Sequence, residues 1–172
     1  HYDVFDDDFR LPPILDDHPS QHEDNWAVIV SSSKYWHNFR QSNNAFMLYN
    51  LLRSRGYPDD RIILFVSENH VCDRRNSDPG FASCSRSTDF PKVSSFGADV
   101  EVDFSGYGAD ATQFMRILLG TQDAHTPKEK TLRSTNTSNV LVYISSHSGE
   151  YFTKFQDYEF LSAFEMNQIF RT

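Results

Sequence analysis

The sequence predicts an α/β fold organised around a mainly parallel sheet. Three short apolar runs, at residues 27–30, 62–66 and 140–144, are typical of strands buried on both faces. Between the first two runs, apolar residues recur at helical spacing over residues 42–55, and Gly56 and Pro58 supply an end to that helix. A strand, a helix and a strand over this length indicate one right-handed crossover unit with two parallel strands.

The later elements follow the same alternation. Residues 110–119 predict a second helix, with Asp110 as N-cap and Gly120 as its end. After the strand at residues 140–144, we expect a short strand near residues 151–155 and a helix near residues 160–170. Residues 68–98 show little periodicity and predict a long irregular loop, of the kind that is often functional.

Composition places the chain among globular domains and excludes some partners. The 172 residues fit one domain, and 38% hydrophobic with 15% aromatic residues supports a packed core. The net charge of −8 lies largely in residues 1–24, which we expect to form an acidic arm before a domain at residues 25–172. This charge disfavours nucleic acid as a partner. No run approaches the ~20 apolar residues that span a bilayer, and a chain that begins at His1 is expected to be processed, trimmed or partial.

One histidine stands in a position suited to chemistry. His147 follows directly from the predicted strand at residues 140–144 into a turn of small residues, Ser146, Ser148 and Gly149. Ligands of open parallel sheets sit beyond the carboxyl ends of the strands. A histidine there has the near-neutral pKa of a general acid or base, and the alternative is an ordinary loop histidine.

The loop at residues 33–41 reaches the same edge of the sheet and mixes aromatic with polar side chains. Its Asn38 can orient an imidazole through the side-chain carbonyl, and Arg40 can bind a carboxylate or carbonyl oxygen. A pocket wall is one interpretation, and a loop packed around Trp36 is the other.

Several segments carry a resemblance to a known family, in order from Asn25 to Asp157. The chain resembles the catalytic subunits of glycosylphosphatidylinositol (GPI) transamidases, in the legumain-like branch of the caspase-fold cysteine peptidases. The matching segments are Asn25-Trp26-Ala27-Val28-Ile29-Val30, Tyr35-Trp36-His37-Asn38-Phe39-Arg40, Gly56-Tyr57-Pro58-Asp59, Cys72-Asp73-Arg74-Arg75-Asn76, Asp99-Val100-Glu101-Val102-Asp103 and Lys154-Phe155-Gln156-Asp157.

The resemblance implies a caspase-like three-layer sandwich that is incomplete at its C-terminal side. By the same resemblance, His147 is the catalytic histidine, and Asn38 orients it. The family's nucleophilic cysteine follows a further helix and strand, so it is expected beyond Thr172, and this chain alone is expected to be inactive. Cys72 matches a cysteine that forms a disulfide with a partner subunit, whereas Cys84 has no recognised counterpart.

The family pattern also assigns substrate and metal positions. Arg40, Gln41, Ser148 and Gly149 match positions at the substrate site, although the family has Gly-His-Gly-Gly where this chain has Ser146-His147-Ser148-Gly149, and usually histidine in place of Gln41. Asp59, Glu101 and Asp103 match positions around a structural calcium ion. They supply the hard oxygen donors that calcium requires, and solvated surface charges are the alternative. No cofactor is expected for the chemistry itself.

Three functions remain open from the sequence. The first is a catalytic-subunit segment of a GPI transamidase in the endoplasmic reticulum lumen, joined to the membrane through its complex or a segment outside this chain. Its partners would be the other subunits, proprotein C-terminal signals and the GPI lipid, and Asn136 would be a lumenal glycosylation acceptor in Asn136-Thr137-Ser138. The second is a legumain-like asparaginyl endopeptidase, and the third is a non-catalytic caspase-like binding module.

Overall fold

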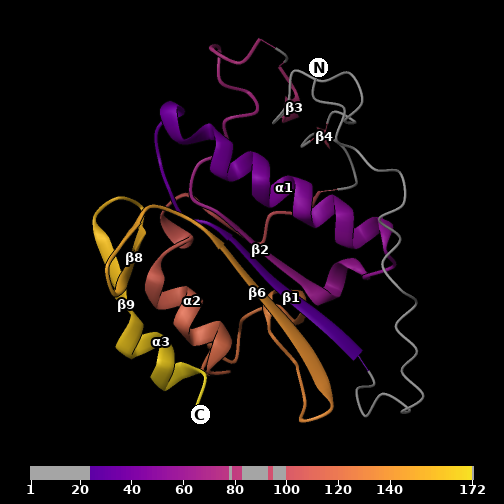
Figure 1. Ribbon diagram of the computed structural model, residues 1–172. Coiled ribbons are helices and arrows are strands. Elements are labelled where there is room, and N and C mark those ends of the chain that lie inside the picture. Colours follow the sequence, from indigo (N-terminus) through magenta and orange to yellow (C-terminus); the bar gives the residue numbers. More distant parts are fainter. Residues whose placement is uncertain (1–23, 78, 83–92, 95–99, 172) are drawn as a thin grey trace, which may run out of the picture.

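The centre of the molecule is a parallel sheet. The computed structural model describes residues 24–77, 79–82, 93–94 and 100–171. Within these residues, four strands lie in the order β5-β2-β1-β6, and each neighbouring pair is parallel (Figure 1). The strands are β1 (Asp24–Ser31), β2 (Ile62–Val66), β5 (Phe104–Ser105) and β6 (Ser138–Ser145). The predicted parallel α/β architecture is therefore confirmed.

Helices cover both faces of this sheet and give three layers. Helix α1 (Phe39–Ser54) covers one face, while α2 (Ala111–Leu118) and α3 (Ala163–Ile169) lie on the other (Figure 1). Successive side chains of a strand point to opposite faces. Accordingly, Ala27 and Ile29 join the core under α1, and Val28 and Val30 join the core under α2. The apolar runs of β1 and β2 are thus buried on both faces, as predicted. The prediction was wrong for β6, whose residues are all exposed or only partly buried, because its free side is not covered in the described residues.

The ends of α1 follow from local chemistry. A 3-10 turn, η1 (Trp36–Asn38), leads directly into the helix, so α1 begins three residues before the predicted start. At the other end Gly56 has φ +92°, its N–H donates to the Arg53 carbonyl, and the Tyr57 N–H donates to the Leu52 carbonyl. This is a Schellman motif, which satisfies two of the last helical carbonyl groups.

Helix α2 is capped as its sequence predicts. The Asp110 carboxylate accepts the N–H of Gln113 at 2.6 Å, and Gly120 closes the helix with φ +63°. The Glu159 carboxylate accepts the N–H of Ala111 at 3.0 Å, which joins the start of α2 to the C-terminal part of the chain.

Short antiparallel strands were harder to predict. The tail forms a sheet of β7 (Ser148–Gly149), β8 (Phe152–Phe155) and β9 (Glu159–Ser162), of which only β8 was expected. The long loop contains a two-stranded ladder of β3 (Phe81–Ala82) and β4 (Val93–Ser94). Three more 3-10 turns are η2 (Asp59–Arg61), η3 (Gly106–Gly108) and η4 (Lys128–Lys130).

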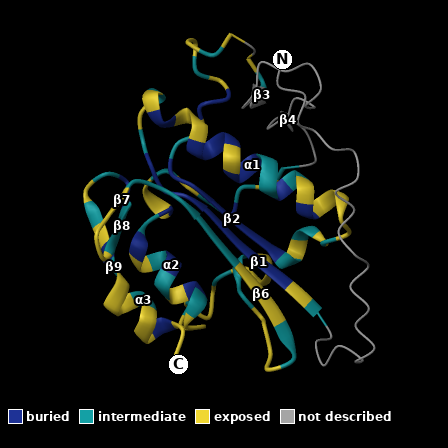
Figure 2. Cartoon of the chain, viewed as in Figure 1, coloured by how far each residue is buried: buried dark blue, intermediate teal, exposed yellow. Residues whose placement is uncertain are grey.

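Strand β6 forms one edge of the described sheet. Figure 2 shows β2 and most of β1 as buried and part of β6 as exposed. In β6, Val140 is 39% exposed and Leu141 is 40% exposed. Because β6 pairs with β1 on one side only among the described strands, its other side presents unpaired backbone groups.

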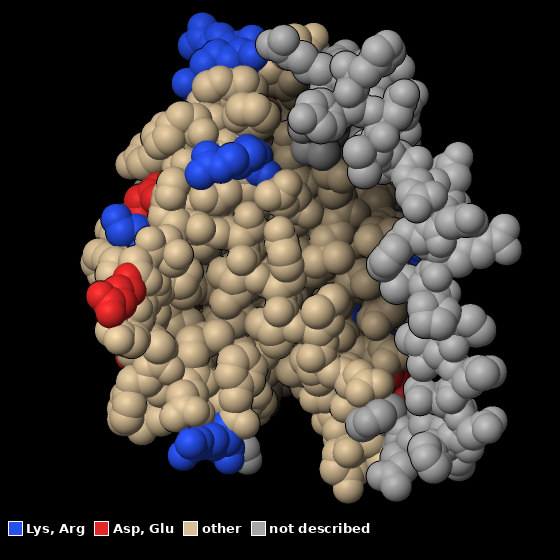
Figure 3. Space-filling view, in the orientation of Figure 1, with Lys and Arg blue, Asp and Glu red and all other residues tan. Residues whose placement is uncertain are grey.

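The charged side chains do not gather into one patch on the face that Figure 3 shows. On the face shown in Figure 3, Lys, Arg, Asp and Glu side chains occur as separate groups among broad uncharged areas. Among the described helices, none is both long and apolar enough to cross a membrane. The predicted acidic arm lies outside the described residues, apart from Asp24, which begins β1.

Candidate active site

Three strand ends bring polar side chains to one edge of the sheet. His147 follows β6, the loop that carries Asn38 follows β1, and Glu68 follows β2. Since all three strands are parallel and adjacent, their carboxyl ends meet at this edge. Asn38 is 2% exposed and His147 is half-buried, so the pair lies partly shielded from solvent.

The structure joins the two predicted catalytic residues directly. The His147 Nε2 atom lies 2.7 Å from the Asn38 Oδ1 atom. The Asn38 Nδ2 atom donates to the Lys34 carbonyl at 2.7 Å and lies 3.3 Å from the His37 Nε2 atom. Because the Lys34 carbonyl only accepts, the amide nitrogen of Asn38 must face it, and the amide oxygen must face His147.

This arrangement decides which imidazole nitrogen carries the proton. An amide oxygen only accepts, so His147 donates its Nε2–H to Asn38. In the neutral imidazole the other nitrogen, Nδ1, then has the free lone pair and is the basic site. Asn38 stands at the N-cap of α1 without capping it, since its side chain is used to orient the histidine.

A hairpin fixes the backbone around His147. The N–H of Lys154 in β8 donates to the His147 carbonyl at 2.9 Å. The Lys154 carbonyl accepts the Ser32 hydroxyl at 2.6 Å, and the Ser146 hydroxyl also faces it. The end of β1, the turn at His147 and β8 therefore hold one another in place.

The backbone of the turn around His147 shows which of its positions require glycine. Ser146 and Ser148 both have φ outside the positive range, so their backbone does not require the glycines that the family pattern has there. At Gly149 an added Cβ would meet the ring of Phe152 at 2.5 Å. The glycine therefore makes room for a side chain of this protein, a reason that the sequence alone did not reveal.

The predicted substrate residues differ in their exposure. Arg40 is exposed, and its Nη1 atom donates to the His37 carbonyl at 3.3 Å. Gln41 is only 4% exposed, and its Oε1 atom has no hydrogen-bond partner among the described residues. Arg40 is thus open to a ligand, while Gln41 points into the protein.

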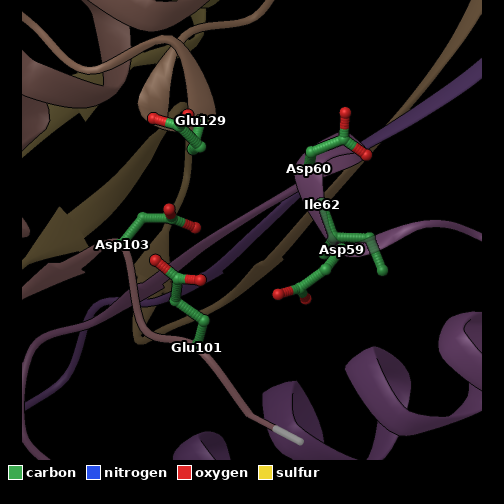
Figure 4. Close-up of a pocket in the computed structure, with 6 residues that line it drawn as sticks. All are labelled: Asp59, Asp60, Ile62, Glu101, Asp103 and Glu129. Carbon is green, nitrogen blue, oxygen red and sulfur yellow. The ribbon is translucent and has the colours of Figure 1, made fainter. Parts of the chain in front are cut away.

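The predicted calcium ligands lie around one pocket. Asp59, Glu101 and Asp103 direct their carboxylates toward a common space, whereas Asp60 points away from it (Figure 4). Burial raises the pKa of Asp103 to about 7, and the negative charges of Glu101 and Asp59 add to the rise, which the N–H of Leu64 opposes. In the described residues, however, no group of three or more His, Cys, Asp or Glu side chains has the spacing of a bound metal ion.

The remaining predicted sites lie on the surface or outside the described residues. Cys72 is exposed and has a free thiol, in the loop after β2. Asn136 is exposed in a turn before β6. Cys84 lies outside the described residues.

Sequence reasoning missed two carboxylates that support the loop beside Asn38. Glu68 accepts the N–H of Tyr35 at 2.7 Å, and Asp157 accepts the N–H of Lys34 at 3.2 Å. Glu68 lies two residues past the end of β2, and this position could have indicated that it lies at the same edge of the sheet as Asn38 and His147. Asp157 gave no such signal, because its place depends on the turn between β8 and β9.

Comparison with known proteins identifies the family of this chain. A family model described as the peptidase C13 family matches residues 25–172. The GPI-anchor transamidase of Schizosaccharomyces pombe is 36% identical over 146 residues, which are 84% of this chain and 37% of that protein. The GPI-anchor transamidase of Homo sapiens is 34% identical over 151 residues, which are 88% of this chain and 38% of that protein. The chain thus spans less than half the length of these relatives, and it belongs to the peptidase C13 family of cysteine peptidases.

Proposed function

We propose that this chain is the histidine-bearing part of a GPI-anchor transamidase. Two relatives that carry this name align with more than four fifths of the chain. The observation that carries the proposal is the hydrogen bond from His147 to Asn38 at 2.7 Å. It leaves Nδ1 of His147 as a base at the edge of the sheet where ligands of this fold class bind.

The proposed reaction has two steps. His147 takes the proton of a cysteine thiol, the thiolate attacks a carbonyl carbon near the C-terminus of a proprotein, and His147 returns the proton to the departing amine. The product is a thioester. The amine of a GPI lipid then attacks this thioester, gives its proton to His147, and releases the thiolate.

The nucleophile of this reaction is proposed to come from outside residues 1–172. Cys72 follows β2, and β1 lies between β2 and the His147 strand β6, so the two loops begin two strand spacings apart, roughly 10 Å. The free side of β6 is where a further strand would bring a thiol next to His147. The chain by itself is then expected neither to cleave nor to transfer.

Arg40, with Gln41, Ser148 and Gly149, is proposed to shape the substrate site around His147. The exposed Arg40 guanidinium can bind a substrate carboxylate or carbonyl oxygen. The Gln41 side chain is buried, so its contribution would be to support this region rather than to contact a substrate from the open surface.

A transfer assay distinguishes the three candidate functions. The full-length protein with its partner subunits is given a peptide that ends in a GPI-attachment signal, together with hydroxylamine as a small amine nucleophile. A transamidase forms mainly the hydroxamate. An endopeptidase forms mainly the free acid, and a non-catalytic module forms neither product. Free acid that does not decrease as hydroxylamine increases would contradict the proposed transamidation.

We also propose a structural calcium ion at Asp59, Glu101 and Asp103. The support is the convergence of the three carboxylates and the raised pKa of Asp103, which a divalent cation would relieve. Bringing the ligands to coordination distance requires the side chains to move inward, since they are not spaced for an ion as they stand.

Cys72 is proposed to form a disulfide with a partner subunit in the lumen of the endoplasmic reticulum. Its thiol is exposed in a loop that Val71 anchors in the core, so it is both accessible and held in place. Non-reducing electrophoresis of the assembled complex should show a higher-mass band that is absent in Cys72→Ser. A band that persists in this variant would exclude Cys72 as the linking residue.

A further inference from the structure

The peptide unit between Lys34 and Tyr35 links a strained backbone to the orientation of His147. Its carbonyl belongs to Lys34 and accepts Asn38 Nδ2 at 2.7 Å, while its N–H belongs to Tyr35 and donates to Glu68 Oε2 at 2.7 Å. One peptide plane is therefore held from both sides, by Asn38 through its oxygen and by Glu68 through its nitrogen.

This plane is held in an unfavourable orientation. Tyr35 has φ +70° and ψ +144°, a combination that only glycine adopts readily. Rotating the Lys34–Tyr35 peptide by about half a turn would change φ of Tyr35 to a negative value near the β region and remove the strain. That rotation would also turn the Lys34 carbonyl away from Asn38 and the Tyr35 N–H away from Glu68.

The carbonyl of Lys34 decides how the Asn38 amide lies. If it turned away, Nδ2 of Asn38 would lose its main acceptor, and the amide would be free to rotate and to offer Nδ2 to His147. His147 would then accept at Nε2 and carry its proton on Nδ1, which is the opposite tautomer. The basic nitrogen would face Asn38 instead of the reacting groups.

We propose that Glu68 is a positioning residue for His147. By accepting the Tyr35 N–H, its carboxylate keeps the strained peptide in the orientation that fixes the Asn38 amide and leaves Nδ1 of His147 as the base. Asp157 assists, since it accepts the neighbouring Lys34 N–H at 3.2 Å. The inference rests on the proposed role of His147 as proton acceptor, and it adds a residue that touches neither His147 nor a substrate.

Three variants test the inference in the full-length protein. Glu68→Ala removes the acceptor, and Glu68→Gln keeps an acceptor oxygen without the charge. The double variant Glu68→Ala with Tyr35→Gly also removes the backbone strain at residue 35. In this variant, rotation of the peptide between residues 34 and 35 would no longer relieve any strain. Tyr35→Gly alone is the reference for the double variant, and Asp123→Ala, an exposed carboxylate on a distant loop, controls for the loss of one negative charge.

The first measurement is the tautomer of His147, read from the ring ¹⁵N chemical shifts of histidine-labelled protein and assigned by loss of the signal in His147→Gln. We expect protonated Nε2 and unprotonated Nδ1 in the parent protein, in Glu68→Gln and in Asp123→Ala. Glu68→Ala should show a mixture with the opposite tautomer. Tyr35→Gly should shift that mixture back.

The second measurement is the kinetics of amide formation. Glu68→Ala should lower kcat roughly 10- to 100-fold with little change in KM or unfolding temperature. Glu68→Gln should stay close to the parent, and the loss from Glu68→Ala should be smaller in the Tyr35→Gly background than in the parent.

The two measurements separate this inference from the proposed function. A changed tautomer in Glu68→Ala without any transamidation in the parent protein supports the positioning role and contradicts the function. Transamidation in the parent with an unchanged tautomer and kcat in Glu68→Ala overturns the positioning role. An equal loss of kcat in Glu68→Ala and Glu68→Gln also overturns it, because the effect would then come from the charge of Glu68 and not from the hydrogen bond to the Tyr35 N–H.

Discussion

At the scale of single residues, the direction of two hydrogen bonds fixes the orientation of Asn38 and His147. The Lys34 carbonyl can only accept, and this one fact orients the Asn38 amide and then the His147 imidazole. The sequence pointed to both side chains by their places after strands. It could not show that Gln41 is buried or that Gly149 accommodates Phe152, because both depend on packing between distant segments.

Asp103 makes a prediction about pH at this scale. Its pKa is raised to about 7 in the fold, so between about pH 4 and pH 7 the folded protein binds more protons at this site than the unfolded chain. The free energy of unfolding should therefore fall as pH rises through this range. In Asp103→Asn, which keeps an oxygen to accept the Leu64 N–H, chemical denaturation with a chelator present should show a smaller fall.

The stabilisation by calcium at this carboxylate should increase as pH rises, which is opposite to the pH dependence without the ion. Because the ion binds the deprotonated form, it should raise the unfolding temperature more at about pH 8 than at about pH 5.5. At a concentration 100 times Kd the stabilisation would be about 2.7 kcal/mol. Calorimetry with and without calcium measures this. An equal effect in Asp103→Asn at about pH 8 would show that the ion does not bind at this pocket.

At the scale of elements, prediction succeeded where patterns are long and local. The strands β1, β2 and β6 and the helices α1 and α2 follow from apolar runs, periodicity and caps at Asp110, Gly56 and Gly120. The strands β5, β7 and β9 have two to four residues each and were missed, because so short a segment has no period of its own. Their pairing is decided by tertiary contacts.

The end of α1 provides a test of the local reasoning. Gly56 has φ +92°, so Gly56→Ala should lower the free energy of unfolding by about 1 kcal/mol, although an added Cβ meets no atom within 4 Å. Gly108 is the matched control, since its added Cβ also meets open space and its φ is not positive. Urea denaturation should show Gly108→Ala within about 0.5 kcal/mol of the parent. Equal losses in both variants would mean that the left-handed conformation of Gly56 is not what matters.

At the scale of the whole molecule, the sheet has one poorly covered edge in the described residues. Val140 and Leu141 are exposed in the first half of β6, and the turn that carries His147 follows the other end of this strand. An exposed apolar edge strand favours association with other chains. The same edge is where the proposed nucleophile-bearing strand would pair, so catalysis and solubility are expected to depend on the same surface.

Isolated residues 1–172 should therefore aggregate through β6. Leu141→Lys should reduce light scattering of the isolated chain at equal concentration, because a charge on an edge strand opposes pairing. Leu51→Lys is the control, since Leu51 is 50% exposed on α1, away from the sheet edge. If both substitutions reduced scattering equally, added charge rather than the β6 edge would explain the effect.

The proposed role of His147 in moving protons during GPI attachment is tested most directly in cells that carry only a His147→Ala version of the full-length protein. Surface display of a GPI-anchored reporter is the measurement, and the amount of the variant protein is followed by immunoblot. We expect GPI attachment to fall at least ~10²-fold in His147→Ala while the protein persists. The control His125→Ala, a change at an exposed loop histidine, should leave attachment unchanged. Undiminished attachment in His147→Ala would remove His147 from the proposed mechanism.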